Sequence, residues 1–250
     1  MKKLNLLFLV ILQLGCSNSD STVTNATSTD GKIDISTVVK AKYFNSAVVS
    51  TNGTSISIKS NGLPEHKTPY WGVGNALYED FPTGYHANVN TSMAAQNYTM
   101  TIPAKPSVAT THEETTLGAI GLALNGVPIY NDREGGNVPL DALTITTFDF
   151  SGAHPGPGKD YHYHTTGRYT TSDDAKLVGF LRDGFPIYGR KDNDGSYPSN
   201  LDAYGGHTGV TADFSEALYH YHASNINYLN TGYYVLKAGA YYGIKGPFTQ

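Results

Sequence analysis

One four-residue segment occurs twice in the chain, as Tyr161-His162-Tyr163-His164 and again as Tyr219-His220-Tyr221-His222. Successive side chains of an extended strand point to opposite faces. In each copy the two histidines therefore share one face, and the two tyrosines share the other. A buried strand of this length more commonly carries Val, Ile or Phe on its inner face. The two tetrads therefore indicate a functional site that is built on strands.

The tetrads belong to a longer internal repeat. A Gly-x-Pro-Ile-Tyr run at 126–130 returns at 184–188, with the same offset of 58 that separates the tetrads. An Asp-x-x-Gly-x-His motif at 149–154 returns at 202–207, with an offset of 53. The differences in length fall in the connections, where loops tolerate them. We expect two related units, at about 117–170 and 175–225, that pack about a pseudo-twofold axis.

Turn and strand signals predict a mainly β fold. Each unit begins with an apolar run that leads through Asn125-Gly126 or Asp183-Gly184 into the Pro-Ile-Tyr segment, which is typical of a β-hairpin. Asn52-Gly53 predicts another hairpin, and the alternation at 97–102 predicts a strand. A chain of 250 residues with 39% hydrophobic side chains suits a single domain. We expect a β-rich single domain, with an α+β arrangement as the alternative.

The N-terminal segment has the pattern of an export signal. Two lysines precede an apolar run at 4–12, which is too short to span a bilayer as a mature helix. Cys16 follows this run in a setting that resembles a bacterial lipobox, although Gln13 stands where Leu is usual. We expect a signal peptide at 1–15, lipidation at Cys16, a polar tether at 16–31 and the domain at 32–250. The predicted location is the bacterial envelope, lipid-anchored at the periplasmic or outer-membrane surface.

The net charge and the motifs of the sequence exclude some classes of function. The formal net charge is −4, and there is no basic excess of the kind that binds phosphate backbones, so nucleic acid is not an expected partner. The motifs of nucleophilic hydrolases and of nucleotide-binding enzymes are missing from the sequence. The sequence leaves open whether the protein is an enzyme, and it identifies no protein partner.

Six of the nine histidines fall on repeated positions, which favours transition-metal binding. In each unit a His-x-His strand and the His of Asp-x-x-Gly-x-His offer three imidazole nitrogens, which suit Cu, Zn and Fe. Asp149 or Asp202 could add a fourth ligand or accept the other ring N–H. The repeat has no cysteine or methionine, so a Cu(I) site is not expected and Zn(II), Cu(II) or Fe(II) remain. The predicted ligands are His154, His162, His164, His207, His220 and His222.

Other interpretations of these residues remain open. The histidines and tyrosines could form a buried hydrogen-bond network that holds the units together. Three histidines with an open fourth position would also suit a metal-dependent envelope enzyme, either a hydrolase or an oxidase. The many tyrosines fit a structural or glycan-contacting surface protein that needs no metal.

The histidines outside the repeat have a simpler interpretation. His66 could complete a site, but a hydrogen-bonded structural role is the preferred interpretation for His66, His86 and His112. The segment Asp192–Gly195 begins like a calcium loop but lacks the required glutamate, so we interpret it as a turn.

Several segments together resemble the bacterial YHYH-domain family, over roughly residues 60–225. They are S-N-G-L-P-E-H at 60–66, L-N-G-V-P-I-Y at 124–130, F-S-G-A-H at 150–154, Y-H-Y-H at 161–164 and D-G-F-P-I-Y-G at 183–189. The family is named for the tetrad, so the resemblance implies a shared domain, and its chemistry has to be argued from the residues. A Pro-Gly-Pro-Gly segment at 155–158 precedes only the first tetrad. If one unit alone binds an ion, we favour the first.

Overall fold

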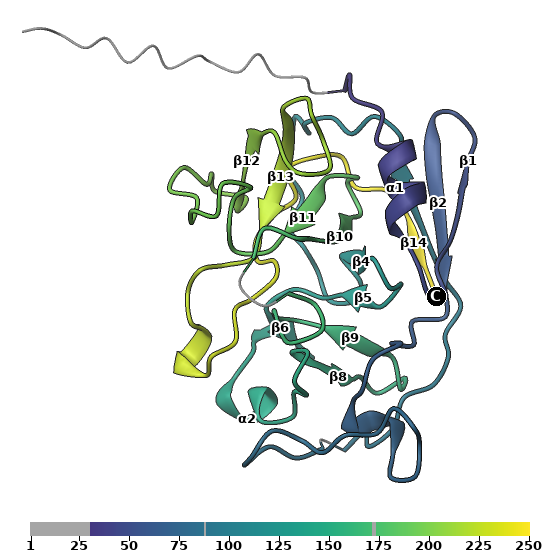
Figure 1. The fold of residues 1–250 in the computed structure, drawn as a ribbon, viewed down its shortest axis with the longest axis vertical. Coiled ribbons are helices and arrows are strands. Elements are labelled where there is room, and N and C mark those ends of the chain that lie inside the picture. Colours follow the sequence, from purple (N-terminus) through teal and green to yellow (C-terminus); the bar gives the residue numbers. More distant parts are fainter. Residues whose placement is uncertain (1–30, 88, 172–173) are drawn as a thin grey trace, which may run out of the picture.

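Strands dominate the fold, as the sequence predicts (Figure 1). The computed structural model describes residues 31–87, 89–171 and 174–250, so the predicted signal peptide, Cys16 and most of the tether lie outside the described residues. Within the described ranges no helix is long and apolar enough to cross a membrane. The helices are short, at Ser36–Lys42 (α1), Pro69–Trp71 (η1), Ala142–Ile145 (α2) and Tyr228–Asn230 (η2).

A four-stranded sheet is formed by the N-terminal segments together with the C-terminal strand. Its order is β1 (Val48–Thr51), β2 (Ser55–Ser60), β3 (Tyr98–Pro103) and β14 (Phe248–Thr249). The predicted hairpin around Asn52-Gly53 is present, and Gly53 supplies the left-handed conformation of the turn with φ +93°. In β3 every second side chain is buried, beginning at Tyr98, so one face of the strand packs on the core.

An eight-stranded sheet contains both units of the repeat. The first unit supplies β4 (Gly121–Ala123), β5 (Pro128–Ile129), β8 (Ala153–Pro155) and β9 (Tyr161–Tyr163). The second supplies β10 (Leu177–Leu181), β11 (Pro186–Tyr188), β12 (Gly206–Gly209) and β13 (Leu218–His222). The strand order is β12-β13-β11-β10-β4-β5-β9-β8. It is symmetric about its centre, because β12, β13, β11 and β10 of the second unit correspond to β8, β9, β5 and β4 of the first. Both predicted hairpins, β4–β5 and β10–β11, are antiparallel pairs.

The pairing of β4 with β10 at the centre of this sheet shows where the pseudo-twofold axis lies. Leu122 pairs with Phe180, and the two residues are separated by the repeat offset of 58. On either side, Gly121 pairs with Leu181 and Ala123 pairs with Gly179. A Cβ on Gly179 would lie 2.2 Å from the Leu122 carbonyl oxygen, so this close approach requires glycine.

Both large sheets contribute to one hydrophobic core. Ile56 and Ile58 of β2 lie in the same buried cluster as Leu122 and Phe180 at the centre of the eight-stranded sheet. A smaller cluster lies beside the first unit and consists of Leu140, Ile145 and Phe148, with Tyr85, Tyr228 and Tyr233 packed against it. A two-stranded sheet of β6 (Arg133–Glu134) and β7 (Val138–Pro139) follows β5.

Candidate metal centres

Antiparallel pairing brings three histidines together in each unit. Strands β8 and β9 pair with His154 directly opposite His162, and β12 and β13 pair with His207 directly opposite His220. Because the side chains of opposite residues lie on the same face of a sheet, the third histidine joins the face that the His-x-His pair already shares. The Asp-x-x-Gly-x-His motif therefore forms a hairpin partner for the tetrad.

Each histidine of the tetrads is fixed by a hydrogen bond from Nδ1–H to a backbone carbonyl. A carbonyl oxygen only accepts, so Nδ1 carries the proton and Nε2 keeps its lone pair. The acceptors in the two units are separated by the same offset of 58. The pairs are His162 with Asp160 at 2.7 Å, His164 with Asn131 at 2.6 Å, His220 with Leu218 at 3.0 Å and His222 with Gly189 at 2.9 Å.

The third histidine of each unit is held by a side chain instead. His154 Nδ1 lies 2.8 Å from Thr147 Oγ1, whose own proton is donated to the Thr144 carbonyl, so the hydroxyl accepts from the ring. His207 Nδ1 lies 2.9 Å from Asn200 Oδ1, at the equivalent position of the repeat. These contacts leave Nε2 of all six histidines as the atom with a lone pair.

In the first unit these Nε2 atoms converge with a carboxylate. His162 Nε2 lies 3.1 Å from His164 Nε2. Glu134 Oε1 lies 3.1 Å from His154 Nε2 and 3.4 Å from His164 Nε2. All four donor atoms lie within 4.8 Å of one another.

The second unit repeats this arrangement with an aspartate. His207 Nε2 lies 3.0 Å from His220 Nε2 and 3.2 Å from His222 Nε2. Asp192 Oδ1 lies 3.0 Å from His207 Nε2 and 3.3 Å from His222 Nε2. Tetrahedral donors about 2.0–2.1 Å from an ion are about 3.3 Å apart, so both clusters have nearly the spacing of a four-coordinate site.

Burial favours the neutral form of four of these imidazoles. It lowers the pKa of His154 and His222 and lowers that of His162 well below its ordinary value. The pKa of His220 falls to about 3 for the same reason. Each cluster therefore presents imidazole lone pairs to its centre, together with one carboxylate oxygen.

Two atoms of the first cluster are buried without a hydrogen-bond partner, namely Glu134 Oε1 and His154 Nε2. They lie 3.1 Å apart, and the assigned tautomer leaves no proton between them. Buried polar atoms are rarely left unsatisfied, and lone pairs at this distance repel one another. A cation at the centre of the cluster would satisfy both atoms, so the donor set fits a metal ion.

The tyrosine face of the tetrads is structural and contains the aspartates of the repeated motif. Tyr161 donates to Asp149 Oδ2 at 2.5 Å, and Tyr219 donates to Asp202 Oδ1 at 2.9 Å. The sequence pattern is compatible with these aspartates as fourth ligands or as acceptors from the histidine rings. The structure differs, because each carboxylate stabilises its own turn and the first tyrosine of the tetrad on the opposite side of the strand.

The histidines outside the repeat lie outside both clusters. His66 Nε2 is 2.7 Å from the Tyr163 hydroxyl, and its ring stacks on Tyr169, so it has the structural role that was preferred. His86 contacts the Ala87 carbonyl, and His112 contacts the Tyr241 carbonyl.

The two carboxylates of the clusters are not among the ligands predicted from the sequence. Glu134 lies in β6, and Asp192 lies in the segment that was interpreted as a turn. That turn is present, but its first side chain faces the histidines. The two acidic residues are 58 positions apart, which is the offset of the tetrads. A search of the repeat for matched acidic residues would have found them.

Residues 99–199 of the chain match the family described as YHYH protein. This match supports the resemblance to the YHYH family for that part of the chain. The match begins in β3 and ends between Asp192 and the second group of histidines, so it is narrower than the expected 60–225. The matched segment contains all four residues of the first cluster. Comparisons with curated proteins and with solved structures give no match.

Proposed function

We propose that this protein binds two transition-metal ions, one in each unit of the repeat. The observation that supports this most directly is the convergence of three Nε2 lone pairs and one carboxylate oxygen within 4.8 Å, twice, on equivalent residues. A hydrogen-bond network alone does not account for it, because the Nδ1 contacts already use the ring protons. The histidines of each unit act as neutral ligands, and the carboxylate offsets part of the ionic charge.

The donor set favours Zn(II), Cu(II) or Fe(II). Imidazole suits all three ions, and one carboxylate beside it is common in their sites. No sulfur atom belongs to either cluster of the described residues, which argues against a Cu(I) site. Storage, delivery or sensing of such an ion is the role that the proposal assigns.

The N-terminal sequence supports a location at the cell envelope. A signal peptide followed by Cys16 would export the chain and attach it to a membrane through lipid, with the metal-binding domain on the periplasmic or outer-membrane surface. Labelling of growing cells with a fatty-acid analogue tests the anchor. Incorporation that is lost in Cys16→Ser supports it, and equal incorporation by both forms contradicts it.

Elemental analysis tests metal binding. The protein is purified without an affinity His-tag and compared with His162→Gln/His164→Gln, with His220→Gln/His222→Gln and with His86→Gln as a control outside the clusters. We expect about two ions per chain in the wild type and the control, and about one in each double variant. Absence of metal from wild-type protein, even after incubation with Zn, Cu and Fe salts, would contradict the proposal.

A metal-dependent envelope enzyme is the second candidate. The carboxylates are the most exposed members of the clusters, with side-chain exposures of 29% for Glu134 and 24% for Asp192. Both clusters therefore lie close to the surface on the carboxylate side, as a metal-dependent enzyme requires, although the Glu134 Oε1 atom itself is buried. Turnover of model esters or oxidation of phenols by metal-loaded protein, lost in both double variants, would favour this candidate over simple binding.

A further inference from the structure

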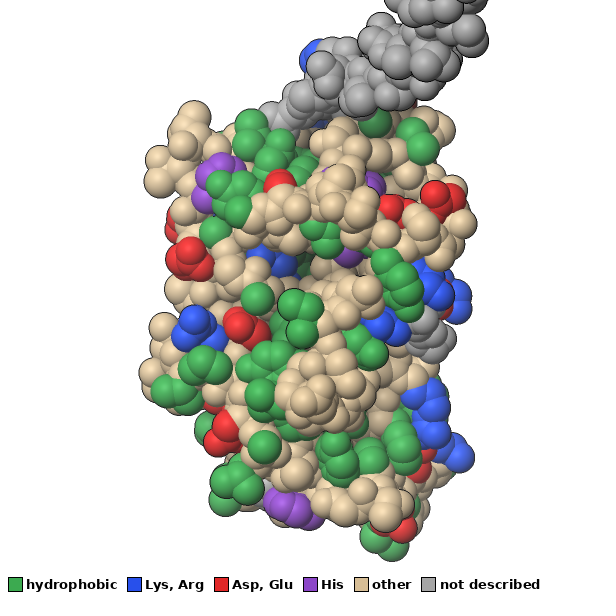
Figure 2. Space-filling model, turned by 90° about the vertical axis from the view of Figure 1, so that its left-hand side faces the viewer, with side chains coloured by type: hydrophobic (Ala, Val, Ile, Leu, Met, Phe, Trp, Pro, Cys, Tyr) green, Lys and Arg blue, Asp and Glu red, His purple; other side chains and the backbone are tan. Residues whose placement is uncertain are grey.

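In each unit, one stretch of chain connects the carboxylate of the cluster with the third histidine. It runs from Glu134 to His154, over 20 positions, and from Asp192 to His207, over 15 positions. Both third histidines lie on edge strands of the eight-stranded sheet, β8 and β12. Helix α2 of the first stretch and β12 at the end of the second lie on the side of the molecule that Figure 2 faces. The packing of the connecting stretch therefore contributes to how firmly these two ligands are held.

The connecting stretch of the first unit packs over its cluster. The ring of Phe148 is fully buried and stacks on His164, with centroids 5.4 Å apart and planes 7° apart. It also meets His154 edge-on at 5.0 Å. Leu140 and Ile145 of the same stretch are buried with Phe148 in one apolar cluster. The third histidine of the first unit is therefore held by side chains that would have to leave a buried environment before it could move.

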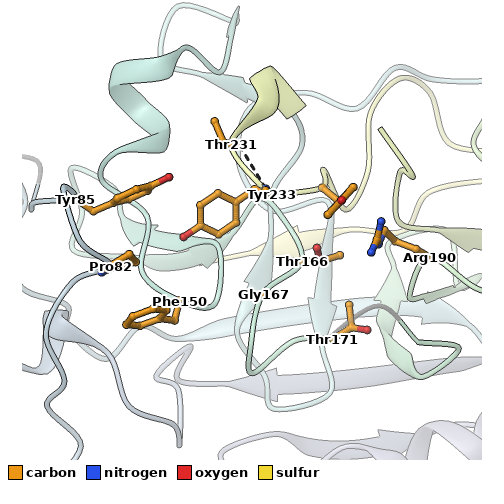
Figure 3. A pocket seen from close by; sticks show the side chains of 11 residues that line it. Pro82, Tyr85, Phe150, Thr166, Gly167, Thr171, Arg190, Thr231 and Tyr233 are labelled. Carbon is orange, nitrogen blue, oxygen red and sulfur yellow. Dashed lines mark hydrogen bonds between the residues drawn. The ribbon is translucent and has the colours of Figure 1, made fainter. Parts of the chain in front are cut away.

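Two tyrosines from distant segments close this apolar cluster. Tyr85 and Tyr233 pack against it, and Figure 3 shows their rings beside one another. Tyr233 meets Phe148 edge-on at 5.8 Å and donates a hydrogen bond to the Asp149 carbonyl at 2.7 Å. Both tyrosines also line a hollow of about 460 Å³ (Figure 3), but neither Phe148 nor the histidines of the first cluster belong to its lining. The hollow therefore does not reach the first cluster.

The connecting stretch of the second unit has no such packing. Its residues 193–200 read N-D-G-S-Y-P-S-N, form no helix and are nearly all exposed. By the repeat offset of 53, Leu201 stands at the position of Phe148, and it is partly exposed. Leu201 and His222 both line a cavity of about 650 Å³. The second cluster thus has a cavity at its border and lacks the buried aromatic ring of the first.

Among the histidines of the clusters, the third one differs in exposure between the units. The side chain of His207 is 12% exposed and that of His154 is 4% exposed, whereas the second histidine of each tetrad is 1% exposed. The residues that hold the two rings differ in the same direction, because Thr147 is buried and Asn200 is exposed. Figure 2 shows histidine side chains at the surface of this side of the molecule. The second cluster is therefore the more open to solvent.

We propose that metal ions enter and leave at the second centre, and that the first centre keeps its ion because the apolar cluster around Phe148 holds its third histidine. This inference rests on the proposed function, in which both centres bind an ion. An ion leaves a site when the outer ligands move away, or when a competing ligand reaches it from solvent. Local opening costs more free energy where it exposes more apolar surface. Both routes are thus easier at the second centre than at the first.

The two centres then have different tasks. Storage and delivery need an ion that exchanges, and the second centre supplies it. The ligands of the first centre come from β6, β8 and β9, so an ion that stays there ties these strands together. The first ion therefore acts as a structural element of the domain.

Stopped-flow release of Zn(II) from the full-length protein tests this inference. Protein loaded with two Zn(II) ions is mixed with an excess of the chromophoric chelator 4-(2-pyridylazo)resorcinol. We expect two phases of about one ion each, with rates that differ at least about tenfold. His220→Gln/His222→Gln should lose the fast phase, and His162→Gln/His164→Gln should lose the slow phase.

The outcomes separate this inference from the proposed function. Uptake of fewer than two Zn(II) ions by the wild type would contradict the proposed function, and the inference would fall with it. Two ions that leave at one rate would overturn the inference alone. A fast phase that disappears with the histidines of the first unit would do the same.

Variants of the apolar cluster test the reason for retention. Phe148→Leu gives the first unit the residue found at Leu201, so the slow phase should become at least about threefold faster and the fast phase should stay unchanged. Ile145→Val is a smaller change in the same cluster and should act in the same direction. As a control, Leu143→Ala changes an exposed side chain of α2 and should alter either rate less than about twofold. An unchanged slow phase in both folded cluster variants would overturn the inference.

Discussion

Glu134 and Asp192 occupy the same place in the two halves of the eight-stranded sheet, each with one carboxylate oxygen within 3.4 Å of two histidine Nε2 atoms. They are separated by 58 positions, as are the tetrads. The repeat therefore duplicates a complete four-donor cluster, in which the carboxylate is the only charged ligand. The contribution of each carboxylate to metal binding can therefore be measured with the other cluster as an internal reference.

Removing either carboxylate should weaken one centre and leave the other intact. Glu134→Gln and Asp192→Asn keep the size of the side chain but lose its charge, so we expect at least tenfold weaker binding of one of two ions. Competition with a chromophoric chelator measures the two affinities. The exposed Glu216→Gln should behave like the wild type, and an equal loss at both ions in either variant would contradict the assignment of one carboxylate to each centre.

The groups that hold Nδ1 should affect metal affinity without touching the ion. Thr147→Val removes the acceptor for the His154 ring proton and leaves that N–H buried, so metal affinity at the first centre should fall about 10–100-fold. The free energy of unfolding should fall by about 1–3 kcal/mol. Asn200→Ala removes the equivalent contact of the more exposed His207, and solvent can replace it, so a smaller change in affinity is expected. Chelator competition and urea denaturation measure the two quantities.

The tyrosine face of the tetrads should affect folding stability and leave metal binding unchanged. Tyr161→Phe removes the hydrogen bond to the buried carboxylate of Asp149, and we expect the free energy of unfolding to fall by about 1–3 kcal/mol. The folded variant should still bind the full complement of metal, because neither residue belongs to the cluster. Loss of one ion from protein that remains folded would show that the two faces of the tetrad are coupled.

The pseudo-twofold axis should be sensitive to a single methyl group. Gly179→Ala places a Cβ against the Leu122 carbonyl oxygen in the middle of the sheet and should cost about 1–3 kcal/mol of stability. Gly135→Ala is the matched control, since a Cβ there meets no atom within 4 Å and its φ is not in the left-handed region. Urea denaturation of the two variants should separate them by at least about 1 kcal/mol.

Lys237 should make stability depend on pH in the alkaline range. Burial lowers the pKa of its ammonium group to about 8, whereas the unfolded chain titrates near the ordinary value of about 10.4. Between pH 8 and about pH 10.4 the unfolded state binds more protons than the folded state. The titration of Lys237 therefore raises the free energy of unfolding as pH rises through this range and lowers it as pH falls toward 8. Relative to Lys237→Met, the wild type should gain about 2 kcal/mol between pH 7 and 9.5. Urea denaturation at both pH values checks this, and parallel pH profiles would contradict it.

The sequence by itself determined the repeat, the hairpins and the set of histidines. These follow from local rules, since Asn-Gly and Asp-Gly turns close hairpins and strand alternation places two histidines of each tetrad on one face. The third histidine could be predicted because it recurs with the repeat. The envelope location and the lipid anchor remain predictions from the N-terminal sequence.

Only the tertiary structure decided which acidic residues join the histidines and which distant segments line the cavity beside His222. Asp149 is close to the tetrad in sequence, but the turn it stabilises directs its carboxylate to the tyrosine side. Glu134 is 20 positions before His154, and only the fold of the β5–β6 connection brings it into the cluster. The cavity that His222 lines is formed by Asp132, Tyr228 and residues at 201–205, 224–226 and 235–239, which come from separate parts of the chain. Contacts between distant segments are set by packing, and a local sequence pattern does not specify packing.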